Sequence, residues 1–327
     1  MQNTPPCTLT NRQLFTTLIR SASRAPSSHN TQPWLFRISN AHIVLLADRT
    51  RALPVNDPHD RELTISCGCA LFNLRVEAAH RGLIAHTEIR LIGDDPDCLA
   101  RVSIDSVPDS QDALASLQPY IDKRRTYRKV FATREVDASI VQQLQDAAQA
   151  EGAWVRPLTT EQSRHAAADL VAEGDAAQWA NPSWRRELAA WMHARHRGDG
   201  LTVPTVARPV MQMIVRTFNM GRSVGAKDRQ LAESSPLLAV LGTDCDGIPD
   251  WIQAGQALQR VLLVACQFGM QASYLNQPVQ VSVLRVKLQD LTGTGEPHLL
   301  LRFGYPLGDA RATPRRSIED IIEFTND

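Results

Sequence analysis

One segment near the start of the chain combines a stiff backbone with neutral hydrogen-bonding side chains. Residues 25–34 read Ala-Pro-Ser-Ser-His-Asn-Thr-Gln-Pro-Trp. Pro26 and Pro33 fix φ and therefore favour a rigid, non-helical segment after the apolar, helix-like residues that end near Arg24. Hydroxyls, one imidazole and two amides lie between these prolines. Such donors and acceptors suit a planar ligand with polar edges, because they bind its ring without adding net charge.

A second segment, Arg124–Lys129, reads Arg-Arg-Thr-Tyr-Arg-Lys. In an extended chain Arg124, Thr126 and Arg128 project to one side. Two guanidinium groups that flank a hydroxyl match a phosphate monoester, which accepts forked, charge-assisted hydrogen bonds. Taken alone, these residues favour a basic linker between two halves of the chain.

A third basic cluster reads Thr-Pro-Arg-Arg-Ser at residues 313–317 and precedes a predicted amphipathic helix over residues 318–324. Its plain interpretation is an N-cap at Ser317 with Arg315 and Arg316 as surface charges. The three clusters together are more informative than any one of them. They predict one site with a part that binds a polar ring and a part that binds an anion.

These segments resemble motifs of the nitroreductase-like flavoenzymes. Residues 25–34 resemble the A-P-S-x-x-N-x-Q-P-W signature that lines one side of FMN in that family, and Gly304-Tyr305-Pro306 followed by Pro314-Arg315 resembles its late basic feature. Ordinary members are short chains that form homodimers. Here the Arg-Arg-Thr-Tyr-Arg string opens the second half of the chain, an order that resembles the Acg-type branch, in which a nitroreductase dimer looks fused into one polypeptide.

The resemblance implies the residues of an FMN site. Its flavin part is Pro26, Ser27, Ser28 and Asn30, with Gln32 and Trp34 nearby; its part for the phosphate, ribityl chain and pyrimidine edge is Arg124, Thr126 and Arg128, completed by Arg315 or Arg316. A large aromatic that opens a strand is also typical of a core residue, and the role of His29 is left open. Because each motif occurs once, we expect one FMN per chain, a pseudo-dimeric monomer and no catalytic side chain.

A weak internal repeat predicts how these segments are positioned. Gly68-Cys-Ala-Leu71 matches Gly255-Gln-Ala-Leu258, 187 residues later, and the same offset relates the glycines at positions 82 and 269. Each copy reads as an apolar helix that ends at a glycine and is followed by a strand. We therefore predict two half-domains, residues 1–115 and 116–327, related by a pseudo-two-fold axis and crossing closely at small residues. The predicted fold class is α+β, a three-layer α/β/α arrangement.

The remaining elements follow from spacing and composition. Residues 34–38 and 42–46 read as a hairpin, and residues 237–241 and 298–303 as buried strands. Helices are predicted over residues 9–24, 137–151, 161–178 and 182–197. Segment 198–233, with its glycines and prolines, reads as irregular and is either a lid over the site or an ordinary surface excursion.

Composition narrows the classes of function. Lys plus Arg and Asp plus Glu both number 35, so no global field attracts nucleic acid or an anionic membrane. Cys67 and Cys69 are too close for a metal knuckle, and no metal is expected. With no predicted signal peptide or membrane span, we expect a cytoplasmic protein with a small-molecule partner, possible further self-association, and reduced, mostly buried thiols.

The resemblance implies ping-pong hydride transfer from NAD(P)H through FMN to a nitroaromatic, a quinone or a similar acceptor. No G-x-G-x-x-G follows a predicted strand, so the nicotinamide would stack transiently on the flavin. Two alternatives stay open at this point. One is a flavin-sequestering protein covered by segment 198–233, and the other is a flavin-free scaffold whose arginines bind phosphate.

Overall fold

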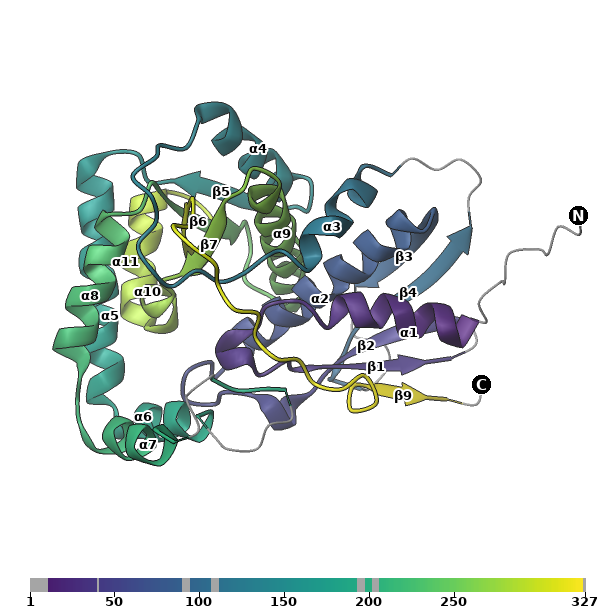
Figure 1. The fold of residues 1–327 in the computed structure, drawn as a ribbon, viewed down its shortest axis with the longest axis horizontal. Helices are drawn as coiled ribbons and strands as arrows, with labels where there is room; N and C mark the ends of the chain where they lie inside the picture. Colours follow the sequence, from purple (N-terminus) through teal and green to yellow (C-terminus); the bar gives the residue numbers. More distant parts are fainter. Residues whose placement is uncertain are drawn as a thin grey trace, which may run out of the picture.

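Two β-sheets lie on either side of a pair of long crossing helices, α2 and α9 (Figure 1). The computed structural model describes residues 11–39, 41–89, 95–106, 112–192, 198–201 and 206–325. The first sheet has the order β3-β4-β2-β1-β9 and the second β5-β6-β8-β7. The mixed α and β class and the arrangement in two halves agree with the prediction.

The first sheet contains β1 Trp34–Ile38, β2 His42–Ala47, β3 Leu83–Ile89, β4 Cys98–Ser106 and β9 Ile322–Phe324; the second contains β5 Trp154–Pro157, β6 Leu237–Thr243, β7 Gln271–Tyr274 and β8 Glu296–Gly304. The helices are α1 Asn11–Ala22, α2 Arg61–His80, α3 Gln118–Ile121, α4 Ala138–Gln149, α5 Glu161–Ala180, α6 Pro182–Ala190, α7 Arg208–Thr217, α8 Gly221–Glu233, α9 Ile248–Gln267, α10 Gln277–Gln280 and α11 Ser282–Thr292. The short 3₁₀ helices are Ser28–Asn30, Arg49–Arg51 and Ala113–Leu117.

The hairpin of β1 and β2 and the buried strands β6 and β8 confirm the corresponding predictions. Helices α1, α4 and α5 also confirm their predictions. Over the described chain, each begins and ends within two residues of its predicted bounds. The helix predicted over residues 182–197 ends at Ala190, and residues 193–197 lie outside the described residues.

The close crossing of α2 and α9 confirms the interpretation of the repeat. A Cβ built on Gly68 would lie 2.4 Å from the carbonyl oxygen of Ile252, and one on Gly255 would lie 2.1 Å from that of Ile65. Both pairs are related by the same offset of 187 residues as the sequence repeat. Side chains at these two positions would therefore hold the backbones apart.

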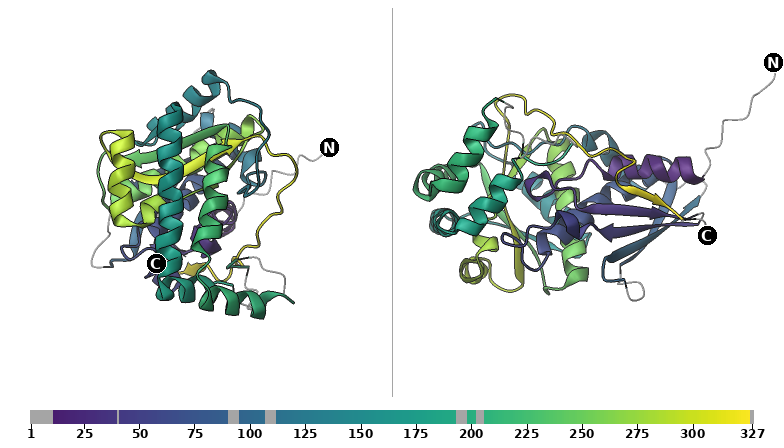
Figure 2. Two further views of the ribbon diagram at one scale, coloured as in Figure 1. Left: turned by 90° about the vertical axis from the view of Figure 1, so that its left-hand side faces the viewer. Right: turned by 90° about the horizontal axis from the view of Figure 1, so that it is seen from below.

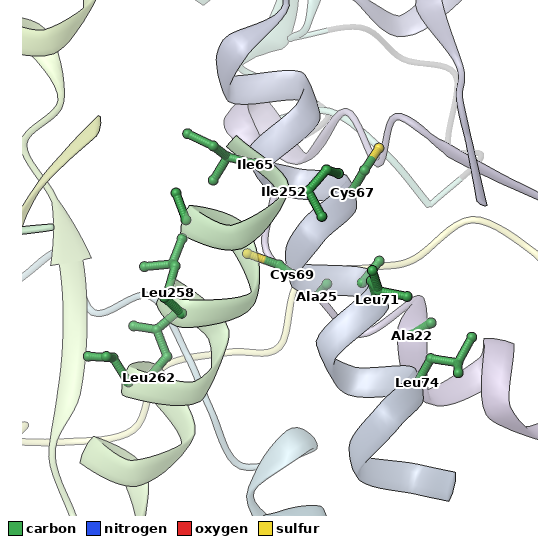
Figure 3. Close-up of a cluster of buried hydrophobic side chains, with 14 of the residues drawn as sticks. Ala22, Ala25, Ile65, Cys67, Cys69, Leu71, Leu74, Ile252, Leu258 and Leu262 are labelled. Atoms are coloured by element: carbon green, nitrogen blue, oxygen red, sulfur yellow. The ribbon is translucent and has the colours of Figure 1, made fainter. Parts of the chain in front are cut away.

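The core extends outward from this crossing to both sheets. Figure 3 shows Leu71 and Leu74 of α2 directed toward Ala22 and Ala25, while Leu258 and Leu262 lie on the side of α9 that faces the second sheet. The four leucines are at most 4 % exposed. One continuous apolar core thus joins the two halves.

The predicted helix over residues 318–324 is wrong, because Ile322–Phe324 form β9. This strand pairs in parallel with β1, placing Ile322 opposite Phe36, and the Phe36 N–H donates to the Ile321 carbonyl at 2.8 Å. A seven-residue helix is marginal on its own, whereas the free edge of β1 offers backbone partners. After β8 the chain therefore returns to the first sheet (Figure 2). The half-domain boundary near residue 115 stays a prediction.

Segment 198–233 is not irregular as predicted, since α7 and α8 form most of its described part. Gly221 and Gly225, two of the glycines behind that prediction, lie on the face of α8 that packs against α5, and the two helices run side by side in Figures 1 and 2. A Cβ on Gly225 would lie 3.2 Å from the Ala172 carbonyl oxygen. These glycines allow close helix packing.

Replacing Gly255 by alanine tests the role of the crossing. We expect Gly255→Ala to lower the free energy of unfolding by roughly 1–3 kcal/mol or more, because the added methyl group meets backbone that cannot rotate away. Thermal unfolding followed by circular dichroism measures the effect. Gly308→Ala is the matched control, since a Cβ there has no atom within 4 Å. Equal midpoints for both variants would contradict the packing argument.

Candidate functional site

A cavity of about 980 Å³ lies where the three clusters singled out in the sequence converge. Its wall includes the 3₁₀ helix after α1, the start of α2, residues 121–129 and residues 309–315. The opposite side is formed by parts of α5, α8 and α10. Of the predicted site residues, the wall contains Pro26, Ser27, Ser28, Asn30, Arg124, Thr126, Arg128 and Arg315.

Gln32 and Arg316 do not line this cavity but fasten its wall. Gln32 is fully buried, and its Nε2 donates to the Gly198 carbonyl at 2.7 Å while its Oε1 accepts from the Arg316 backbone N–H at 2.9 Å. Arg316 in turn donates to the Gln32 carbonyl and to Asp48. These bonds hold residues 25–34 against residues 313–317.

The backbone at the tip of this segment is left-handed at non-glycine positions, with φ of 49° at His29, 56° at Asn30 and 51° at Gln32. Such residues rarely adopt this conformation, so it persists only where the surroundings enforce it. The Gln32 N–H donates to Ser27 Oγ at 2.9 Å, and Arg315 donates to Asn30 Oδ1 at 3.3 Å. The side chains of Ser28, His29 and Asn30 consequently have fixed positions on the wall.

Trp34 is fully buried in the core cluster at the start of β1 and does not line the cavity. The structure thus places it as a core residue. His29 lines the cavity, and its burial, with a smaller contribution from Arg128, lowers its pKa to about 4. The imidazole is therefore neutral near pH 7. Its Nδ1 is buried and has no hydrogen-bond partner.

The predicted extended segment 124–129 lies along β7. Thr126 forms a parallel bridge with Ala272, and the Tyr127 N–H donates to the Ala272 carbonyl at 2.9 Å. Arg124 is only 6 % exposed; one of its amino groups donates to the Arg24 carbonyl at 3.0 Å, and its Nε has no partner. This segment brings two of its arginines, 124 and 128, to the cavity wall.

Arg315 joins this cationic wall from the C-terminal part of the chain. It donates to the carbonyls of Arg24 and Ala25 at 3.1 and 3.2 Å. Burial, followed by the charges of Arg124, Arg24 and Arg125, lowers its pKa to about 9. Crowded guanidinium groups repel one another, and a bound anion relieves that repulsion. The arrangement therefore suits a phosphate-bearing ligand.

Glu62, in the first turn of α2, is a site residue that the sequence analysis missed. Ser28 Oγ donates to its Oε2 at 2.5 Å, and Gln280 Nε2 donates to its Oε1 at 2.7 Å. Gln178 of α5 donates to Gln280 at 2.6 Å. All four line the cavity, so this hydrogen-bonded chain links residues 25–34 to the helices opposite. An acidic residue in a first helical turn is too common to have signalled it.

Asp175 of α5 and Asp228 of α8 were also missed. Both line the cavity and accept hydrogen bonds from Gln277 Nε2. Burial, and next the charge of Asp228, raises the pKa of Asp175 to about 7, while burial also raises the pKa of Asp228. The sequence signal for Asp175 is only an acid among small residues on a predicted helix, and Asp228 lies in a segment predicted to be irregular.

Further features of the described chain bear on its class. Within the ranges that the structure describes, every helix is too short or too polar to span a bilayer. Among those same residues, no three His, Cys, Asp or Glu side chains gather as ligands for a metal ion. Cys67, Cys69 and Cys266 are buried free thiols.

The chain joins two α/β halves and contains a cavity with a cationic wall. It is 28 % identical over 320 residues to "Putative NAD(P)H nitroreductase Rv3131" of Mycobacterium tuberculosis, covering 94 % of this chain and 90 % of that one. It is 25 % identical over 325 residues to "Putative NAD(P)H nitroreductase acg" of the same organism, covering 97 % of both. The resemblance to the Acg-type nitroreductase-like proteins is thus confirmed.

No family model matches the chain. Among solved structures, the FMN and NADPH-dependent nitroreductase NfnB from "sphigopyxis sp. strain HMH" is 18 % identical, with a TM-score of 0.43, and the match covers 64 % of this chain and 99 % of that one.

The raised pKa of Asp175 predicts how stability depends on pH. Between its ordinary pKa of 3.8 and its value of about 7 in the folded protein, the native state holds a proton that the unfolded state lacks. The free energy of unfolding therefore falls as pH rises through this window, and the contribution is constant above it. Asp175→Asn removes this contribution, so its thermal midpoint falls less between pH 4.5 and 7.

Asp169→Asn is the control, since Asp169 lies on the same helix but is exposed and pairs with Arg229. It should keep the wild-type dependence on pH. The same slope in Asp175→Asn as in the wild type would contradict the assignment.

Proposed function

We propose that the cavity binds one FMN per chain and that the protein is an NAD(P)H-dependent oxidoreductase of the nitroreductase type. The observation that carries the proposal is the convergence of the three sequence clusters, up to 285 residues apart, on one cavity. The names of the relatives support the reaction class. The free thiols Cys67, Cys69 and Cys266 support the reducing cytoplasm as its location.

The unsatisfied groups in the cavity wall fit this cofactor. Within the described part of the chain, Arg124 Nε and Arg315 Nε are buried donors without partners, on the wall where a phosphate would lie. Over the same residues, His29 Nδ1 in segment 25–34 is a buried group without a partner. Buried polar atoms are rarely left unpaired in proteins, so a bound ligand that satisfies them is the simplest explanation.

Different residues of the wall would bind different parts of the cofactor. Arg124, Arg128 and Arg315 would bind the phosphate, with Thr126 toward the ribityl chain. Ser27 already accepts a hydrogen bond from the Gln32 backbone N–H, so its hydroxyl proton is available to the ring edge. Asn30 would line the ring while its amide donates to the Pro314 carbonyl and accepts from Arg315. One of the guanidinium groups, placed at the pyrimidine edge of the bound ring, would favour its anionic reduced form.

When bound, FMN supplies hydride transfer, and the protein contributes position, electrostatics and the exclusion of competing reactions. The acceptor class is a nitroaromatic, a quinone or a similar small molecule. The chain would receive its electrons from NAD(P)H through transient stacking on the flavin. The alternative of a flavin-sequestering protein rests on α5 and α8, which form the far wall of the cavity.

Anaerobic titration of the FMN-loaded protein with NADPH and with NADH tests the proposal. We expect the flavin absorbance to bleach within seconds and to recover when a quinone is added. A flavin that resists both nucleotides, yet bleaches with dithionite, would favour sequestration. A protein that stays colourless and binds no added FMN would contradict both functions.

Arg128→Ala tests the phosphate site. Loss of one charge-assisted contact should weaken FMN binding by about 1.5–3 kcal/mol, which is roughly a 10- to 150-fold increase in Kd. Fluorescence quenching of FMN on titration with apoprotein measures Kd. Arg186→Ala is the control, because Arg186 is exposed on α6 and contacts Ser183 rather than the cavity. An unchanged Kd in Arg128→Ala would remove the assignment.

A further inference from the structure

The cavity wall opposite the arginine cluster contains two carboxylates that the proposed cofactor site does not use. Gln277 Nε2 lies 3.3 Å from each carboxylate oxygen of Asp175 and 3.0 Å from Asp228 Oδ2. One neutral amide thus bridges the two acids, and all three residues line the cavity. Asp175 is 3 % exposed, so bulk water does little to screen it.

A buried cation with an unsatisfied donor lies in the same wall. Arg302 of β8 is 1 % exposed, lines the cavity, and donates to the carbonyls of Lys129 and Tyr127 at 3.0 Å each. Its Nε is buried and has no hydrogen-bond partner among the residues that the structure describes. A ligand oxygen is the natural acceptor for this group, because an unpaired donor in the interior is costly. Arg302 therefore points to a ligand independently of the acids.

We propose that this wall receives the reducible oxygen of the acceptor, which Arg302 polarises and to which Asp175 gives a proton. The inference rests on the proposed function, whose chemistry needs a proton in addition to a hydride. It assigns the acceptor class as one whose oxygen becomes anionic on reduction, such as a quinone.

The step balances for a quinone acceptor. Bound FMN in its reduced form would supply the hydride with its two electrons, which would convert the quinone to a hydroquinone monoanion. The O–H bond of Asp175 breaks as an O–H bond forms on the anionic oxygen, which gives the neutral hydroquinone. The Asp175 carboxylate then regains a proton from water that enters after product leaves. Developing negative charge next to Arg302 is stabilised during the transfer.

The surroundings assign different roles to the two acids. Burial raises the pKa of Asp228, but the hydrogen bond from Gln277 and the charges of Lys227 on its own helix and Arg302 on β8 oppose that rise. Burial, and next the negative charge of Asp228, disfavour ionisation of Asp175 and raise its pKa to about 7. The short helix α10 contributes only the neutral Gln277 to this contact. Two carboxyl groups whose environments separate their pKa values are a recurrent acid-and-base arrangement.

Reoxidation of dithionite-reduced, FMN-loaded protein by 1,4-benzoquinone isolates this step from NAD(P)H. In anaerobic stopped-flow experiments from pH 5 to 9, we expect the wild-type rate to fall above pH 7. Asp175→Asn should be slower by roughly 100-fold below pH 7 and nearly independent of pH, the usual range for loss of a general acid. Asp228→Asn should move the break to lower pH, since the like charge is gone. Asp169→Asn on the same helix should match the wild type.

An infrared titration supplies a readout that needs no turnover. The wild-type protein should show protonated carboxyl C=O absorbance that disappears near pH 7, and Asp175→Asn should lose part of it. Asp57 supplies the remainder, because burial and then the charge of Glu62 raise its pKa to about 7 as well. If Asp175→Asn keeps the wild-type rate and pH profile, or if its carboxyl band is unchanged, the inference is wrong. The proposed function still stands in that case, provided that the variant binds FMN and NADPH reduces it. A chain that binds no FMN overturns the proposed function and this inference with it.

Discussion

The contact between α2 and α9 sets the geometry on which the rest of the molecule depends. Gly68 and Gly255 let two helical backbones approach to a separation that no side chain permits. This separation fixes the distance between the sheets, because each helix packs against its own sheet through large apolar residues. Ile65, Ser66 and Cys69 of α2 and Leu258 of α9 also line the cavity. The core contact and the floor of the site are therefore one structure.

The α2–α9 crossing is nearly symmetric, but the two sides of the cavity beside it are formed by different kinds of residue. Its cationic side comes from three separate parts of the chain, whereas its acidic side comes from α5 and α8, which pack against each other, together with α10. Hydrogen bonds through Glu62 and Gln280 join the two sides. Repeated halves alone would give two equivalent sites. Single copies of the segments 25–34 and 124–129 make the two sides of the crossing chemically different.

Local signals in the sequence were sufficient for much of this structure. The prolines at 26 and 33, the hairpin of β1 and β2 and the spacing of Arg124 and Arg128 act within a few residues, so they can be recognised without the fold. Glu62 depends on Gln280, 218 residues away, and Asp175 depends on a partner on another helix. No local pattern encodes such pairs.

The two wrong predictions, a helix over residues 318–324 and an irregular segment 198–233, also arise from contacts that are distant in the sequence. Residues 318–324 carry an apolar spacing compatible with a helix or a strand, and only the free edge of β1 decides between them. The glycines of α8 have the composition of a loop, yet their lack of side chains serves contact with α5. In both places tertiary packing overrides local preference.

The parallel pairing of β9 with β1 also has a consequence for biosynthesis. Phe36 pairs with a residue made 286 positions later, so the sheet edge beside the ring-binding segment stays open while most of the chain is translated. At about 5–20 residues per second this interval lasts tens of seconds, long enough for an exposed strand edge to meet other chains. The cationic wall shares this delay, since Arg315 emerges only shortly before β9. Nascent chains therefore lack a complete cavity wall until the residues around Arg315 have been made.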